Sequence, residues 1–144
     1  MPKTITCNHA AAQEHVGKIE LEICVIKEQG RSTIKTLPFK ICPCQVIIEL
    51  LYVTVLWINA IPIWETGISA IYSPREIING MKIDFKKHCK LDFGKYVEAH
   101  DEPTPTNGMK SHIIPCVALG PTGNLQGTYK FMDINTGMNL EKRS

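Results

Sequence analysis

Five lysines in one short segment could neutralise phosphate groups, and they are the clearest chemical signal in the sequence. The lysines are Lys82, Lys86, Lys87, Lys90 and Lys95, and we call residues 82–95 the lysine segment. Lysine ammonium groups bind phosphate oxygens and release counterions, which gives an affinity for nucleic acid that ignores base sequence and falls with salt. Nearby carboxylates dilute the positive charge, namely Asp84, Asp92, Glu98, Asp101 and Glu102. The segment predicts weak, non-specific DNA binding, and the alternative is an ordinary solvated surface.

Cysteine and histidine side chains could also hold zinc, which takes nitrogen and sulfur ligands. The candidate ligands are Cys7, His9 and His15 in one group and Cys42, Cys44, His88 and Cys89 in another. Neither group contains two matching C-x₂-C pairs, and the C-P-C stretch is too short for the usual structural zinc knuckle. The sequence therefore predicts no metal site, and it predicts buried or surface thiols that behave as small apolar side chains.

Motifs that would indicate phosphate binding or nucleophilic catalysis are weak in this sequence. The stretches "GPTGN" and "GTYKF" contain glycines without the spacing or the lysine of a phosphate-binding loop, so we interpret them as turns. No Ser/His/Asp or Cys/His arrangement can be located from spacing alone.

The composition is that of a folded globular chain. Its 144 residues fit one domain or slightly more, and the 44% hydrophobic and 21% charged residues argue against disorder. The formal net charge is only +2, so any basic surface must be local. The N-terminal residues lack the layout of a signal peptide, and we therefore expect the six cysteines to be reduced thiols.

The most apolar stretch covers residues 46–63, and it predicts a buried helix rather than a membrane span. Glu49, Asn59 and Pro62 interrupt it, whereas a span needs roughly 20 nearly uncharged residues. We expect the helix over residues 45–61, covered on most sides because it is apolar almost all round. Pro62 ends it, since proline lacks the amide donor. Trp57 and Trp64 could be stacking platforms, but the position of Trp57 in the apolar helix predicts that it lies in the core.

Two further helices are expected on either side of this one. The side chains of Val16, Ile19, Ile23 and Ile26 recur at helical spacing, with Gly30 as the expected end. The same region, "IELEICV", also alternates as a strand would, so the strand stays an alternative. Ser73, Pro74 and Glu76 form the pattern of a capping box, which predicts a short helix that ends near Gly80.

From Phe93 onward, the pattern changes to the two-residue period of strands. The strand candidates are "FGKYVEAH", "HIIPCVALGP", "GTYKFMDI" and "MNLEK", separated by the turn sequences "DEPTPTNG", "GPTGN" and "NTG". Several short strands in a stretch of this length predict a small antiparallel barrel. The fold class expected is α+β, with helices first and the barrel after them.

Several stretches of the chain resemble, in the same order, the Pol polyproteins of copia-type LTR retrotransposons. They are "EHVGKIELEICVIKE", "LPFKICPCQVIIELLYVTVLWINAIP", "GISAIYSPREIINGMKIDFKKHCKLDFGKYVEAH" and "ALGPTGNLQGTYKFMDINTG", which together cover nearly the whole chain. The region that they resemble joins the end of the integrase catalytic core to a small Src-homology-3-like barrel, upstream of the reverse transcriptase.

The resemblance implies a division of the chain and a biological role. Residues 1–84 would be the truncated helical tail of a ribonuclease H-like integrase core, and residues 85–144 the small barrel domain. The role would be DNA integration, with DNA and other integrase subunits as partners and no membrane. The location implied is intracellular, either nuclear or in a cytoplasmic particle.

The resemblance also implies one remnant of a catalytic site. In the family, two aspartates and a glutamate hold Mg²⁺ or Mn²⁺ for phosphodiester transfer. Glu20 matches the glutamate, although Leu21 and Glu22 follow it in place of the usual basic residues. The two aspartates would lie before Met1, and one carboxylate cannot assemble a two-metal centre. We therefore expect the chain to be catalytically inactive alone and to need no cofactor.

Two other interpretations stay open. The chain could be a stand-alone interaction module whose small β-barrel binds a protein partner, with the helices as support. It could also be a decayed reading frame without a selected function.

Overall fold

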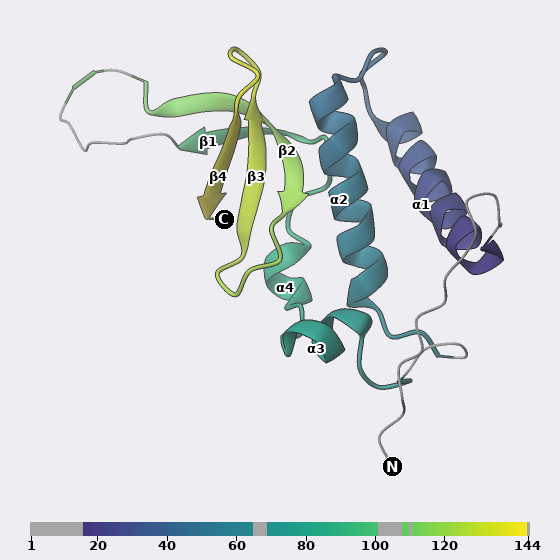
Figure 1. The fold of residues 1–144 in the computed structure, drawn as a ribbon. Coiled ribbons are helices and arrows are strands. Elements are labelled where there is room, and N and C mark those ends of the chain that lie inside the picture. The colour runs from purple at the N-terminus through teal and green to yellow at the C-terminus, as the bar shows by residue number, and fades with distance from the viewer. Residues whose placement is uncertain (1–15, 65–68, 101–107, 110, 144) are drawn as a thin grey trace.

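The computed structural model describes residues 16–64, 69–100, 108–109 and 111–143. These residues form α1 (Gly17–Thr36), α2 (Cys44–Ala60), α3 (Pro74–Asn79), α4 (Phe85–His88), β1 (Tyr96–His100), β2 (Ile113–Pro121), β3 (Thr128–Asp133) and β4 (Asn139–Arg143). The sheet, α2 and α1 stand side by side in that order, and α3 and α4 lie near the C-terminal end of α2 (Figure 1). The α+β class predicted from the sequence is therefore confirmed. The expected domain boundary after residue 84 falls at the start of α4 and stays a prediction.

The first helix forms, in place of the alternative strand, but it is longer than predicted. We expected it to end at Gly30, and this was wrong, because α1 continues to Thr36. A glycine inside a helix costs only about 1 kcal/mol relative to alanine, which packing can offset. Gly30 is buried, and its neighbours Gln29 and Thr33 line a hollow against α2.

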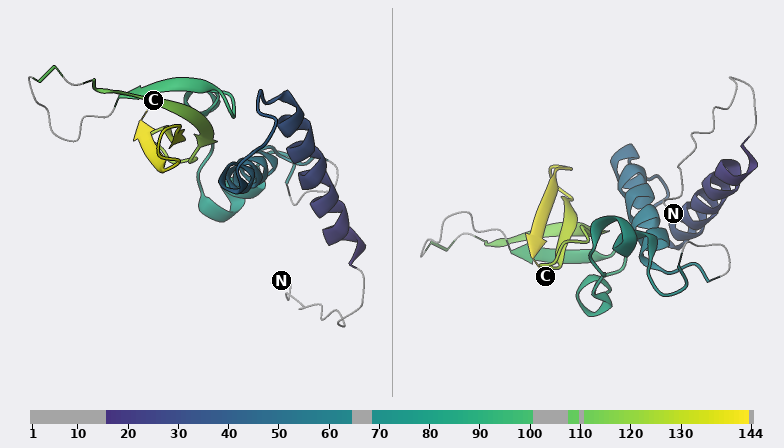
Figure 2. Two further views of the ribbon diagram at one scale, coloured as in Figure 1. Left: turned by 90° about the horizontal axis from the view of Figure 1, so that it is seen from above. Right: turned by 60° about the horizontal axis from the view of Figure 1, so that its bottom comes forward.

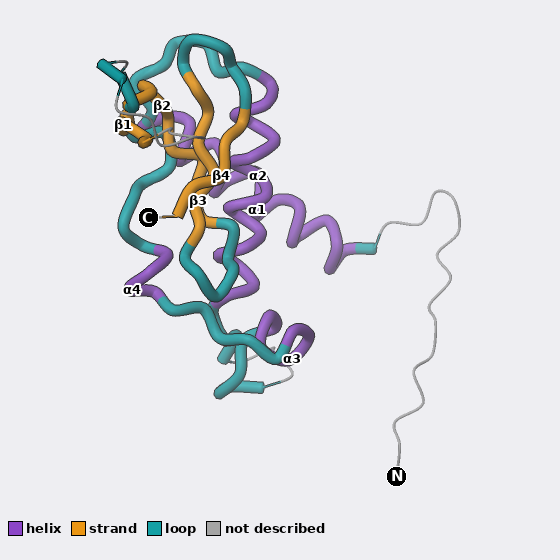
Figure 3. Tube along the Cα trace, turned by 90° about the vertical axis from the view of Figure 1, so that its left-hand side faces the viewer, coloured by secondary structure: helices purple, strands orange, loops and turns teal. Residues whose placement is uncertain are grey.

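The N-terminal part of α1 diverges from α2, as the views in Figure 2 and Figure 3 show. The predicted apolar face is accordingly only partly covered. Ile19 is 58% exposed and Ile23 is 45% exposed, whereas Ile26 is partly buried. Tertiary packing therefore supports the C-terminal half of α1 more than its first turns.

The long apolar helix is confirmed as α2, which begins at Cys44 and ends at Ala60, two residues before Pro62. The expectation that it would be covered on most sides was wrong. Its buried residues are Val46, Glu49, Leu50, Thr54 and Ala60, whereas Ile47, Ile48, Leu51, Tyr52 and Val55 are exposed. The sheet and α1 lie on two sides of α2 (Figure 2), and α3 packs near its C-terminal end. No helix in the described ranges is long and apolar enough to cross a membrane.

The capping box at Ser73 is confirmed and begins α3. The Glu76 backbone N–H donates to Ser73 Oγ at 3.2 Å, and the Ser73 backbone N–H donates to Glu76 Oε2 at 2.8 Å. The hydrogen bond from the Ser73 backbone lowers the pKa of Glu76 below its ordinary value of 4.5, and the Ser73 hydroxyl and the charge of Lys82 act in the same direction. Gly80 ends the helix in the left-handed conformation, as predicted.

The four predicted strands form one antiparallel sheet in the order β1-β2-β3-β4. The predicted turns at "GPTGN" and "NTG" join β2 to β3 and β3 to β4, whereas most of "DEPTPTNG" lies outside the described residues. Closure into a barrel is not confirmed, because the described strands make an open sheet with β1 and β4 at its edges. Closing a sheet requires strands tilted and staggered enough to bring the two edge strands together, and β1 and β4 have only five residues each.

A close approach between β2 and α2 joins the sheet to the helices. The register of β2 shifts between Ala118 and Gly120, which marks a bulge, and Gly120 has a φ of 105°. A Cβ at Gly120 would lie 2.5 Å from Val53 Cγ2. Only glycine combines this backbone conformation with so short a distance to α2. The other face of the sheet packs around Ala99, Cys116, Ala118, Tyr129 and Phe131.

Candidate nucleic-acid interface

The lysine segment contains a short helix, α4, which was not predicted from the sequence. Asp84 begins it, and its Oδ1 accepts a hydrogen bond from the Lys86 backbone N–H at 3.0 Å. Aspartate is a preferred residue at this position because its side chain satisfies a helix donor that would otherwise lack a partner. A single helical turn is too short to produce a periodic pattern in the sequence. Asp84, however, is a residue type that often begins a helix and could have indicated the start of α4.

Two buried side chains anchor the lysine segment to the rest of the protein. Ile83 is 5% exposed and His88 is 2% exposed. The ring nitrogens of His88 lie 2.9 Å from two carbonyl oxygens, Nδ1 from that of Asp84 and Nε2 from that of Asn124 in the β2–β3 loop. The Lys90 backbone N–H donates to the Tyr129 hydroxyl at 2.9 Å. The backbone of the segment is therefore held against the sheet.

The five lysine side chains of the segment are all exposed. Lys87 Nζ lies 3.8 Å from Asp84 Oδ2 and 3.5 Å from the Leu125 carbonyl oxygen, so this lysine is partly engaged within the protein. Lys82 lies close enough to Glu76 to lower the pKa of that carboxyl. Within the described part of the chain, the ammonium groups of Lys86 and Lys95 have no hydrogen-bond or ion-pair partner. The structure thus places the predicted residues on one anchored, solvent-facing stretch.

An aromatic pair that was not predicted from the sequence lies beside the lysines. The rings of Phe85 and Trp57 stack with their centroids 6.1 Å apart and an angle of 16° between their planes. Phe85 is 46% exposed. Trp57 was expected in the core, but it is only partly buried, and it reaches the lysine segment from α2. In the sequence, the position of Phe85 between Lys82 and Lys86 could have indicated an aromatic ring among the lysines.

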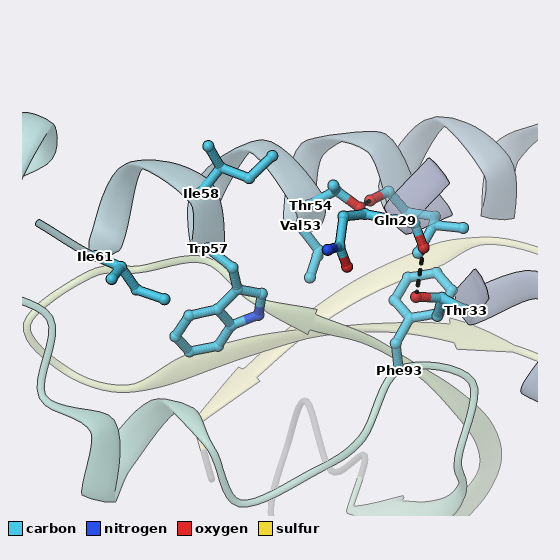
Figure 4. Close-up of a pocket in the computed structure, with 9 residues that line it drawn as sticks. Gln29, Thr33, Val53, Thr54, Trp57, Ile58, Ile61 and Phe93 are labelled. Carbon is cyan, nitrogen blue, oxygen red and sulfur yellow. Dashed lines mark hydrogen bonds between the residues drawn. The ribbon is translucent and has the colours of Figure 1, made fainter. Parts of the chain in front are cut away.

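A hollow of about 350 Å³ lies between α1 and α2 and is closed on one side by Phe93 (Figure 4). Its wall is mostly apolar, and the hydroxyls of Thr33 and Thr54 on its rim donate to helix carbonyl oxygens, those of Gln29 and Leu50. No charged side chain lines this hollow, so it lacks the cationic groups that attract a phosphate. Trp57 also lines a smaller hollow of about 210 Å³, together with His88 and Asp92.

Glu20 lies in the first turn of α1, and its side chain is exposed. In the ranges that the structure describes, no three histidine, cysteine, aspartate or glutamate side chains are close enough together to hold a metal ion. Glu20 therefore belongs to no such group of ligands in those ranges.

The zinc ligands considered from the sequence are not brought together where they can be located. Cys42 and Cys44 lie at the start of α2, whereas His88 and Cys89 lie beside Trp57 near its end, about 20 Å along the helix. Cys7, His9 and His15 lie outside the described residues. Of the five described cysteines, Cys116 is buried, Cys42 is partly buried, and the other three are exposed.

No protein-family model, curated protein or solved structure matches this chain.

Proposed function

We propose that this protein binds nucleic acid through the lysine segment, weakly and without base-sequence specificity. The observation that carries the proposal is the combination of an anchored backbone with five exposed lysines. Charges on a fixed backbone lose less conformational entropy on binding than charges on a free chain.

The distribution of charge supports the same proposal. The lysine segment carries five lysines and two aspartates, a net charge of +3, whereas the whole chain carries +2. The remaining residues together therefore carry −1. A polyanion such as DNA is attracted to the segment rather than to the molecule in general.

We further propose that the chain is a fragment of a copia-type retrotransposon Pol polyprotein associated with DNA integration. In this proposal, α1 and α2 are the remnant of the ribonuclease H-like core and the sheet corresponds to the Src-homology-3-like domain. The fragment would be catalytically inactive alone, and Glu20, with the Mg²⁺ or Mn²⁺ of the parent enzyme, would matter only in the intact protein. Binding to another integrase subunit is compatible with this role.

The salt dependence of DNA binding tests the proposal. With about four phosphate contacts, the slope of log affinity against log salt should be about −3 to −4 on duplex DNA. The triple variant Lys86→Ala, Lys87→Ala, Lys90→Ala should lose affinity equally on unrelated sequences and show a flatter slope. The matched control replaces three exposed lysines of α1, namely Lys18, Lys27 and Lys35, and should bind as the parent does. Equal binding by the parent and the lysine-segment variant would reject the proposal.

A protein-interaction module is the second candidate. The sequence suggested that the barrel would bind the partner, whereas the exposed apolar residues favour a partner that binds the helices. Leu21 is 64% exposed on α1, and Tyr52 is 67% exposed on α2. Exposed apolar patches of this kind often mark protein contacts. Salt-insensitive binding, or no binding, to DNA would make this candidate the better one.

A further inference from the structure

We infer that Phe85, supported by Trp57, is a stacking platform for an unpaired base, so that the lysine segment prefers single-stranded nucleic acid to a duplex. The inference rests on the proposed function and specifies the class of nucleic acid that the same site takes. Its evidence is the stacked pair of Phe85 and Trp57 rather than the lysines.

The Phe85 ring lies against the Trp57 ring and stays partly exposed to solvent. Trp57 lies 6.1 Å from it, measured between ring centroids, and the planes are nearly parallel. Trp57 is itself positioned by α2, where it lines the hollows shared with Val53 and Phe93 (Figure 4). With 46% of Phe85 exposed, the ring keeps a surface on which a further flat group can stack.

The backbone that carries Phe85 is fixed on both sides. Asp84 caps the helix turn, and the Cys89 backbone N–H donates to the Phe85 carbonyl oxygen at 2.9 Å. His88, three residues on, is buried and lies against the Asn124 carbonyl oxygen. The ring is therefore held in place before any ligand arrives, which reduces the entropy lost on binding.

The charges next to Phe85 complement a nucleic-acid strand. Lys82 precedes the ring by three residues and Lys86 follows it directly, and both side chains are exposed. Single-strand binding sites combine such lysines, which contact phosphates, with aromatic rings on which bases stack. In a duplex the faces of the bases are already stacked on one another, so that Phe85 can reach them only in a single strand or at an end.

The test compares single-stranded oligothymidylate with a hairpin duplex at one salt concentration, by fluorescence anisotropy of the labelled nucleic acid. Electrostatic attraction alone favours the duplex, because its charge density is higher. We expect the single strand to bind about tenfold more tightly. Phe85→Leu, which keeps an apolar side chain against Trp57, should weaken single-strand binding at least about fivefold and leave duplex binding unchanged. Phe85→Tyr should bind as the parent does.

A matched control and a second measurement keep the result interpretable. Phe39 is 40% exposed, close to the exposure of Phe85, but it precedes α2, whereas Trp57 lies near the end of that helix. Phe39→Leu should leave affinity unchanged. An abasic strand, which keeps the phosphates and lacks the bases, should bind the parent protein at least about fivefold more weakly than oligothymidylate, and this measurement needs no variant to fold.

The outcomes separate this inference from the proposed function. Equal affinity for the single strand, the duplex and the abasic strand, with all three lost in the lysine-segment triple variant, would overturn the stacking platform and leave the proposed function standing. Unchanged binding in Phe85→Leu would also overturn the platform. Absence of binding to every probe would overturn both.

Discussion

Glu49 of α2 and Lys130 of β3 form an ion pair that joins the helices to the sheet. Lys130 Nζ lies 3.1 Å from Glu49 Oε2, and the two residues are 81 positions apart in the chain. The Glu49 side chain is only 7% exposed, and its Oε1 also accepts a hydrogen bond from Asn139 Nδ2 at 3.4 Å. Lys130 Nζ lies 5.8 Å from the centroid of the Tyr52 ring. These contacts fix the face of α2 that packs against β3 and β4.

The first prediction concerns this ion pair. Lys130→Met leaves the buried Glu49 carboxylate without its cation, so we expect the free energy of unfolding to fall by about 1–3 kcal/mol. Adding Glu49→Gln to that variant removes the buried charge and should recover part of the loss. Urea unfolding of the parent, both single variants and the double variant measures the coupling. Strictly additive effects would show that the pair contributes nothing.

The second prediction concerns the bulge of β2 against α2. Gly120→Ala forces a side chain into a φ of 105° and places Cβ against Val53, and it should cost about 2 kcal/mol or more in unfolding free energy. Gly137→Ala is the matched control, because its φ is also positive, at 69°, but no atom lies within 4 Å of the added Cβ. Its cost should be about 1 kcal/mol. Equal losses in both variants would mean that the contact with Val53 has no effect.

The third prediction concerns pH and the start of α3. Hydrogen bonds from Ser73 lower the pKa of Glu76 in the folded protein, so the stability that they contribute is complete above the ordinary value of 4.5. That stability is lost as pH falls below 4.5 and through the lowered pKa. Glu76→Gln should remove this part of the acid sensitivity, which thermal unfolding at several pH values measures. An unchanged acid profile in Glu76→Gln would contradict the assignment.

Asp133 should account for part of the acid sensitivity that remains. Its pKa is lowered by hydrogen bonds from the Thr136 hydroxyl and from the Asn135 backbone, in the turn between β3 and β4. The sign is the same as for Glu76: the contribution is complete above its ordinary value of 3.8 and is lost below it. Asp133→Asn combined with Glu76→Gln should therefore flatten the acid profile further than either change alone.

The fourth prediction concerns catalysis. With Mg²⁺ or Mn²⁺ and a labelled DNA end, the purified chain should show neither end processing nor strand transfer, because a two-metal reaction needs more carboxylates than Glu20 alone. Gel analysis of the labelled DNA detects both reactions. A metal-dependent product that disappears in Glu20→Gln would reject this expectation.

The sequence predicted the elements whose signals are local. The apolar run with Pro62 at its end predicted α2, the Ser73–Glu76 spacing predicted α3, and two-residue alternation predicted the strands. Each of these signals lies within a few residues of the feature that it specifies. The exposure of the lysine side chains could also be predicted from their residue type, because charged side chains seldom become buried without a partner.

Features that depend on distant contacts could not be predicted in this way. The continuation of α1 through Gly30 depends on burial of that residue in the packed half of the helix. Glu49 interrupts an apolar stretch in the sequence, and only the fold shows that Lys130 pairs with it. Likewise, the Phe85–Trp57 pair joins residues from two separate helices, so the place of Phe85 between two lysines does not reveal its stacking on Trp57.

The central claim is that nucleic acid binds at the lysine segment, and mapping of backbone amide NMR shifts tests it most directly. The protein labelled with nitrogen-15 is titrated with a short oligonucleotide at low salt, and the shift of each amide is followed. We predict that the largest changes fall within residues 82–95 and in the Asn124 loop that His88 contacts, and that added salt reverses them. Changes confined to the exposed apolar residues of α1 and α2, or no changes at all, would contradict the claim.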